Sequence, residues 1–238
     1  MCIRDRLLVF AFAFCLSLSA DVFQNEQVYA AANVVKSFGC DNNNTVSEKY
    51  LENVKAVAII PDVTRTSAIA STQKGKGVFS MRDLNGNWTP PIMITYSSFG
   101  AGPQVGIESA DMILLFQTSK SFRDIFKGQD LLGLNAGGTI GEGSMAGRTT
   151  DLPEVSAYIV KTGKTSGVYF GASLDFGRIV IDDQATNDYY ERIYDYQDIL
   201  NGSPRDSKYT KMLKHALNVY LANDREKFRC DIDKFIVK

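Results

Sequence analysis

Helical periodicity marks the two ends of the chain. Apolar residues recur at helical spacing through residues 21–38, which predicts a helix that Gly39 ends. From Pro204 onward apolar residues again form one stripe along a helix, a pattern typical of a helix that docks on a core rather than one that spans a membrane. The stripe consists of Tyr209, Met212, Leu213, Ala216, Leu217, Tyr220 and Leu221.

Two further helices are predicted from shorter signals. Ser47 is a suitable N-cap for a helix over residues 47–55. Residues 56–60 then form a continuous apolar run, which predicts a buried strand that Pro61 ends. A short helix is also expected over residues 119–126.

The middle of the chain alternates short apolar runs with glycines, which argues against long helices there. The dipeptide Asn85-Gly86 lies between two such runs and predicts a tight two-residue hairpin turn. We therefore expect an α+β fold, with a Gly-rich antiparallel β barrel or sandwich and flanking N- and C-terminal helices. The runs are 78–81, 92–96, 112–116, 155–160, 168–173 and 179–181.

Residues 1–20 are typical of a secretory signal peptide, because Arg4 and Arg6 precede an apolar run and small residues follow it. The alternative is a retained anchor, although the run is short for a membrane span. Residues 1–6 (MCIRDR) resemble the translation of a sequencing adapter, and our hypothesis is that they are an assembly artefact that replaces the true start.

Cleavage would leave two cysteines, Cys40 and Cys230. In an exported protein such a pair is compatible with a disulfide between the first and last segments of the mature chain. Two independent thiols are the alternative.

Composition and motifs argue against several functions. A net charge of −1 and the absence of nucleic-acid-binding motifs predict no nucleic-acid partner. The single histidine, His215, lies in the predicted last helix and has no nucleophile in a recognisable motif, so we expect no enzyme and no catalytic residue.

Two segments resemble ligand-binding motifs but do not match them fully. Residues 163–166 resemble the end of a phosphate-binding loop, but Tyr158 occupies the position that requires glycine. Asp182, Asp183 and Asp188 fit no calcium loop and are expected to form a polar turn. The sequence predicts no metal site and no cofactor.

Basic residues near predicted turns suggest lipid binding, since each cation near an anionic surface contributes about 1 kcal/mol. Ordinary solvated charges are the alternative at each position. Clustering of the lysines on one face would favour lipid, and dispersion beside an exposed apolar patch would favour a protein partner. The candidate lipid-binding residues are Arg65, Lys74, Lys76, Arg82, Lys161 and Lys164.

Large aromatic residues are expected in the core rather than at a membrane. For Trp88 the alternative is a place at a membrane interface, because this residue directly follows the predicted turn and its ring is amphipathic. The others are Tyr96, Phe99, Tyr169 and Phe170.

Six segments between Leu51 and Leu200 stand in a characteristic order: LENVKAVAIIPDV, GKGVFSMRDLNGNWTPPIMI, FGAGPQVGIESADMILLF with Asp111, LNAGGTIGE, AYIVKTGKTSGVYFGASLDFGRIVID, and Asn187 with Tyr190. This ordered set resembles the SYLF domain, which is found in bacterial envelope proteins and in eukaryotic endocytic and actin-associated proteins. The sequence departs from the family pattern in three places: Thr89-Pro90 after Trp88, Gly137-Gly138 in the small-residue strand, and Glu191 after the closing tyrosine.

The resemblance implies a non-enzymatic domain that binds membrane lipids, phosphoinositides in eukaryotic members. For an exported chain we expect anionic envelope lipids, bound at their headgroups through basic turns, in the periplasm or cell envelope. The alternative is a structural or protein-partner scaffold of the envelope without lipid binding. The expected organisation is a signal peptide (1–20), an N-terminal helical segment (21–50), the SYLF-like domain (51–200) and a C-terminal helical extension (201–238).

Overall fold

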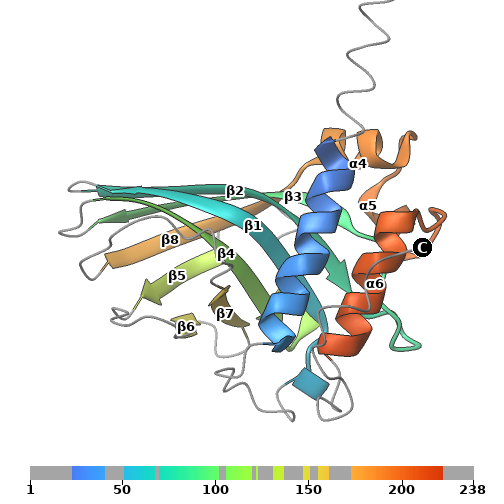
Figure 1. The fold of residues 1–238 in the computed structure, drawn as a ribbon, viewed down its shortest axis with the longest axis horizontal. Coiled ribbons are helices and arrows are strands. Elements are labelled where there is room, and N and C mark those ends of the chain that lie inside the picture. Colours follow the sequence, from blue (N-terminus) through green and yellow to red (C-terminus); the bar gives the residue numbers. More distant parts are fainter. Residues whose placement is uncertain are drawn as a thin grey trace, which may run out of the picture.

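A long antiparallel sheet with helices packed over one end makes up the described part of the chain (Figure 1). The computed structural model describes residues 23–40, 51–67, 70–101, 106–119, 122, 131–136, 147–150, 155–160 and 173–221. The predicted α+β class, with an antiparallel sheet and flanking helices, is confirmed within these residues.

Eight strands are present in the described residues, and all of their pairings are antiparallel. The pairing order is β1-β2-β3-β8-β5-β6-β7-β4, and β4 is also hydrogen-bonded to β1. The strands are β1 (Ala56–Ser67), β2 (Ala70–Met81), β3 (Ile92–Ala101), β4 (Gly106–Phe116), β5 (Leu131–Ala136), β6 (Gly147–Thr150), β7 (Val155–Val160) and β8 (Ser173–Ile181).

Alternation along β1–β4 divides the buried side chains between the two faces of the sheet. Val57, Ile59 and Val78 belong to a cluster that the sheet shares with the helices. Ala58 and Phe79, on the opposite face, belong to a second apolar cluster with aromatic contacts at its centre. The sheet is therefore buried on both faces at the end where the helices dock.

Helix 23–40 and α6 (Lys208–Tyr220) lie side by side on the sheet, blue and orange-red in Figure 1. Both contribute apolar side chains to the same cluster, which confirms that the last helix docks on the core. Gly39 does not end the first helix as expected, since the helix continues to residue 40. A Cβ at Gly39 would lie 2.5 Å from Cβ of Tyr220, so this glycine permits the close approach of the two helices.

Strand β1 passes through Pro61 and reaches Ser67, so the prediction that Pro61 ends the strand is wrong. The pairing register of β1 shifts here, and Asp62 adopts a left-handed conformation with φ of 51°. Asp111 on β4 accepts a hydrogen bond of 2.9 Å from the backbone N–H of Asp62. Proline is tolerated at such a bulge, where the regular ladder is interrupted.

The prediction of a polar turn at Asp182, Asp183 and Asp188 is wrong, because these residues are the N-cap, the first residue and the sixth residue of a helix. Asp182 caps α4 (Asp183–Tyr190) by accepting a 3.0 Å hydrogen bond from the N–H of Ala185. The short helix α5 (Tyr196–Leu200) follows, and it was not anticipated either. Strong local capping outweighed the turn preference of Asp and Asn at this site.

Parts of two other predicted helices lie outside the described residues. Of the helix expected over residues 47–55, only residues 51 and 52 are described as helical. Ser119 and Phe122 are helical, and the rest of the predicted helix 119–126 is outside the described residues. Among the helices that the structure does describe, none is both long enough and apolar enough to cross a bilayer.

Candidate functional site

Lys74 and Lys76 lie on one exposed face of β2, beyond the part of the sheet that α6 covers. Their cross-strand partners on β3 are Ser97 and Thr95, which are also exposed. The Nζ atom of Lys76 lies 5.2 Å from the centre of the Phe23 ring, at the start of helix 23–40. We call the exposed outer surface of β2, β3 and β8 the basic face.

Apolar side chains accompany the lysines on the basic face. Phe99 on β3 is 57% exposed, and Val180 on β8 is 36% exposed. Arg178 pairs with Ser97 in register and thereby lies in the same row as Lys74. No described residue at these outward register positions is acidic. The face thus combines positive charge with exposed apolar area.

Arg82 occupies a different place, at the end of β2 where the loop to β3 begins. Its guanidinium lies 4.5 Å from the centre of the Trp88 ring and donates a 2.9 Å hydrogen bond from Nη1 to the carbonyl of Gly86. Partial burial lowers the pKa of the Arg82 guanidinium from its ordinary value. Arg82 is therefore a charged, partly desolvated group stacked on an aromatic ring.

The loop between Arg82 and Trp88 is held by one carboxylate. Oδ1 of Asp83 accepts 2.8 Å hydrogen bonds from the N–H groups of Asn85 and Asn87. These contacts, that of Asn87 first, lower the pKa of Asp83. The hairpin was located correctly, but it is a five-residue loop rather than a two-residue Asn-Gly turn, because only Gly86 has a positive φ.

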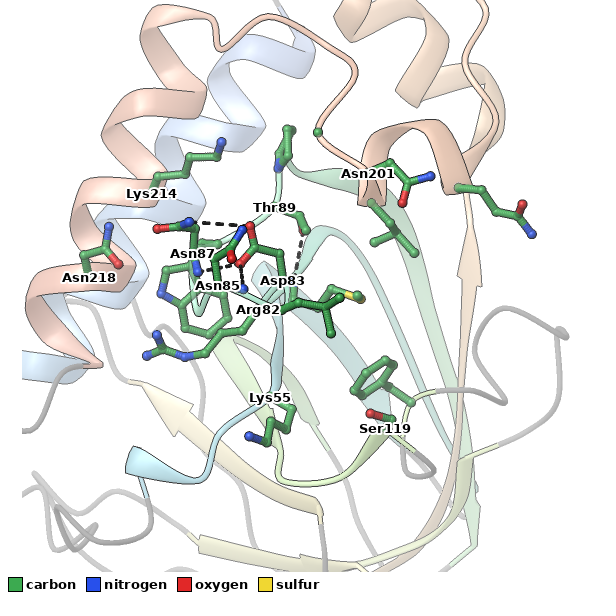
Figure 2. A pocket seen from close by; sticks show the side chains of 18 residues that line it. Lys55, Arg82, Asp83, Asn85, Asn87, Thr89, Ser119, Asn201, Lys214 and Asn218 are labelled. Carbon is green, nitrogen blue, oxygen red and sulfur yellow. Dashed lines mark hydrogen bonds between the residues drawn. The ribbon is translucent and has the colours of Figure 1, made fainter.

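A cavity of about 1180 Å³ adjoins this loop and α5 and α6 (Figure 2). In the close-up, Lys214 and Asn218 come from α6, and Asn201 comes from the region after α5. Lys55 directly precedes β1, and Ser119 lies three residues after the end of β4. Lys214 is already neutralised, since its Nζ lies 2.8 Å from each carboxylate oxygen of Asp206.

The six predicted lipid-binding residues do not form one cluster in the described structure. Lys74 and Lys76 are together, but within a strand rather than in a turn, and Arg82 is six residues from Lys76, about 20 Å along an extended strand. The backbone of Arg65 pairs with Gln73, and that of Thr64 pairs with Lys74. The register position of Arg65 therefore alternates with that of Lys74 and does not belong to the same row of the sheet. Lys161 and Lys164 lie outside the described residues.

Sequence reasoning missed Lys55, which the structure places beside Arg82. The N–H of Arg82 donates a 2.7 Å hydrogen bond to the carbonyl of Lys55. A prediction that β1 and β2 form a hairpin could have placed Lys55 beside Arg82. The register of that hairpin, however, depends on the bulge at Asp62, which the sequence did not reveal.

The prediction that large aromatic residues lie in the core is confirmed at two positions and wrong at a third. Trp88 and Tyr96 are buried as expected, at 2% and 0% exposure. The prediction for Phe99 is wrong, because no helix covers that part of β3, and Tyr169 and Phe170 lie outside the described residues.

The fold and these surfaces define a class of protein: a β-sheet domain with docked helices and exposed cationic groups. The chain belongs to the Ysc84 family, described as "Las17-binding protein actin regulator", whose model matches residues 97–220. This confirms the SYLF resemblance.

Curated relatives agree with the family match. The chain is 28% identical over 167 residues to SH3 domain-containing YSC84-like protein 1 of Homo sapiens, covering 66% of this chain and 46% of that protein. It is 24% identical over 182 residues to SH3 domain-containing protein PJ696.02 of Schizosaccharomyces pombe, covering 75% of this chain and 42% of that protein. The chain thus spans about half the length of the curated relatives it matches, and no solved structure matches it.

Proposed function

We propose that this chain is a non-enzymatic module that binds anionic membrane lipids, and that the basic face is its contact surface. The observation that carries the proposal is the exposure of Lys74 and Lys76 on one face of β2, with no acidic side chain at the described outward positions of β2, β3 and β8. Each lysine near an anionic surface contributes about 1 kcal/mol, so two lysines and Arg178 would give weak, salt-dependent binding.

The exposed Phe99 and Val180 support contact with a membrane rather than with a soluble anion. Apolar side chains beside lysines gain free energy by entering the boundary between headgroups and acyl chains. The sheet is the scaffold that holds these groups on one surface, and the return of the strand pairing from β4 to β1 supports a barrel as its form.

We further propose that the chain is exported to the periplasm or cell envelope, where its lipids would be those of the envelope. The pattern of residues 1–20 predicts export, although these residues lie outside the described part. Cys40 is disulfide-bonded, and disulfides persist chiefly in oxidising compartments, which supports the same proposal.

A protein partner is the second candidate, favoured by the description of the family as binding Las17 and regulating actin. For this chain the partner would be an envelope protein, and the exposed Phe99 would be its contact point.

Co-sedimentation with vesicles tests the lipid proposal. Residues 21–238 are expected to bind phosphatidylcholine vesicles that contain phosphatidylglycerol, and to lose most of that binding at high salt. The double variant Lys74→Gln, Lys76→Gln should lose most of the binding at low salt, because two contributions of about 1 kcal/mol correspond to roughly a thirtyfold change.

The matched control is Lys208→Gln, Lys211→Gln, which removes two exposed lysines from α6, away from the basic face. This variant should bind like the unaltered protein. Equal losses of binding in both variants would show that only the net charge of the protein matters and would contradict the assignment to the basic face. If the unaltered protein does not bind vesicles, the lipid proposal is wrong and the protein partner becomes the proposed ligand.

A further inference from the structure

Lys55 and Arg82 are cross-strand neighbours at the ends of β1 and β2. Ala56 pairs with Met81, so the next register position places Lys55 opposite Arg82, and the 2.7 Å hydrogen bond between their backbones agrees. Both side chains line the same cavity. Like charges directly opposite each other destabilise a sheet, and among the described residues no carboxylate forms an ion pair with either side chain.

Trp88 adds a second observation at the same place. It is 2% exposed and lines the cavity, and its indole Nε1 has no hydrogen-bond partner in the described structure. The Nε of Arg82 is likewise buried without a partner. Buried donors are normally satisfied, so the stacked pair of Arg82 and Trp88 retains unused hydrogen-bonding capacity in the wall of the cavity. Both donor atoms are closed off from solvent, so the charge of the guanidinium, and not these two atoms, is what Arg82 offers to a ligand.

The charges around the cavity favour an anion. Lys214 is balanced by Asp206, and Asp83 directs its carboxylate to the N–H groups of its own loop. Lys55 and Arg82 remain as two cations without a described counter-ion. Guanidinium and ammonium groups side by side are suited to phosphate oxygens, which accept several charge-assisted hydrogen bonds at once.

Amide side chains line the same cavity as these cations. Asn85 comes from the loop, Gln197 and Asn201 from α5 and its end, and Asn218 from α6. Amides offer both donors and acceptors, so they suit the hydroxyl groups of a phosphorylated polyol better than a bare inorganic ion.

We propose that this cavity binds a phosphate ester, with Lys55 and Arg82 holding the phosphate and the amides contacting a hydroxylated group attached to it. The ester is either a soluble molecule or the headgroup of a phospholipid. The site is separate from the basic face and does not depend on the function proposed for that face.

Trp88 provides the measurement, because it is the single tryptophan of the chain and carries Arg82 on its ring. Titration with glycerol 3-phosphate should change the Trp88 fluorescence with a saturable profile, and glycerol should not. A second titration uses phosphatidylcholine vesicles with and without phosphatidic acid. Arg82→Gln and Lys55→Gln should each weaken binding at least about tenfold, as expected for loss of a charge-assisted hydrogen bond.

Lys211→Gln is the matched control, since this exposed lysine of α6 does not line the cavity and should leave the affinity unchanged. Lys55 is exposed, so Lys55→Gln should fold normally and decides the result if Arg82→Gln is unstable. Isothermal titration calorimetry gives the affinities independently of fluorescence.

Saturable binding of glycerol 3-phosphate that both variants weaken supports a soluble ester. Binding of phosphatidic acid vesicles only, with the same dependence on Lys55 and Arg82, supports a lipid headgroup. No response to either ligand, or a response that Lys55→Gln leaves unchanged, overturns the proposal. The double variant Lys74→Gln, Lys76→Gln leaves this cavity intact. The experiments therefore distinguish a wrong proposal for the basic face from a wrong proposal for this cavity.

Discussion

At the residue scale, similar side chains acquire different roles from their surroundings. Lys74 and Lys76 are exposed on an uncovered part of the sheet, whereas Arg82, just after the last residue of the same strand, is partly desolvated against Trp88. Tyr96 and Phe99 differ by three positions, so they point to opposite faces of β3. The face of Phe99 is covered at Met93 but not at Phe99 itself, whereas Tyr96 is buried. The alternation of β3 could be predicted, but the identity of its covered face could not.

Asp83 provides a pH-dependent prediction at this scale. Its carboxylate accepts two N–H groups of the loop, so its folded-state pKa should fall below the unfolded value of about 3.9. The stabilisation that Asp83 contributes is therefore fully present above pH 3.9 and is lost as the pH falls through the lower folded-state pKa. An NMR titration of the side-chain carboxyl carbon measures this directly. Asp83→Asn retains an acceptor but removes the titration and identifies the signal; a midpoint at or above 3.9 would contradict the assignment.

At the scale of elements, the two terminal helices were the easiest to predict, whereas α4, α5 and the ends of the strands were not predicted. The stripe of α6 and the apolar positions of helix 23–40 belong to one buried cluster, as their periodicity predicted. The bulge at Asp62 could not be predicted, because it depends on Asp111 from a strand 49 residues away. The capped start of α4 at Asp182 carried a local signal, which the turn preference of Asp and Asn obscured.

The contact of Gly39 with Tyr220 predicts the cost of a single methyl group between these helices. In Gly39→Ala the new Cβ would lie 2.5 Å from the backbone-attached Cβ of Tyr220, which cannot rotate away. Overpacking of this kind costs about 1–3 kcal/mol, more than the gain in helix propensity of about 1 kcal/mol or less. Urea unfolding should therefore show a less stable variant. Asn33→Ala, at an exposed position of the same helix, should change stability by about 0.5 kcal/mol or less, and equal stability of Gly39→Ala and the unaltered protein would show that the helices are farther apart.

At the scale of the whole molecule, the helices cover one end of the sheet and leave the other end open (Figure 1). This arrangement separates the basic face from the phosphate-ester cavity, which lies where the loop 83–87 meets α5 and α6. The two candidate surfaces can therefore be altered independently, by Lys74→Gln with Lys76→Gln on one side and by Lys55→Gln on the other.

The disulfide of Cys40 gives a prediction at this scale. Cys40 lies at the end of helix 23–40, and its partner is expected to be Cys230, which lies outside the described residues. Proteolysis without reductant, followed by mass spectrometry, should yield a linked peptide pair that contains both residues. Reduction should lower the free energy of unfolding by about 2–5 kcal/mol. Cys40→Ser should be insensitive to reductant, and a free thiol at Cys230 in the unreduced protein would exclude this pairing.

Local sequence by itself determined the two terminal helices, the apolar segments at the centre of several strands, the position of the β2–β3 hairpin and membership of the family. The strands themselves are longer than the predicted runs, and β2 continues through Gly75 and Gly77. Only the tertiary structure decided which of these positions became a surface. Lys55 and Arg82 are 27 residues apart and meet because of the β1–β2 register, while Lys74 is exposed and Val78 buried on the same face of β2 because the helices cover only one end. Periodicity states that a strand has two faces; long-range packing determines what covers each of them.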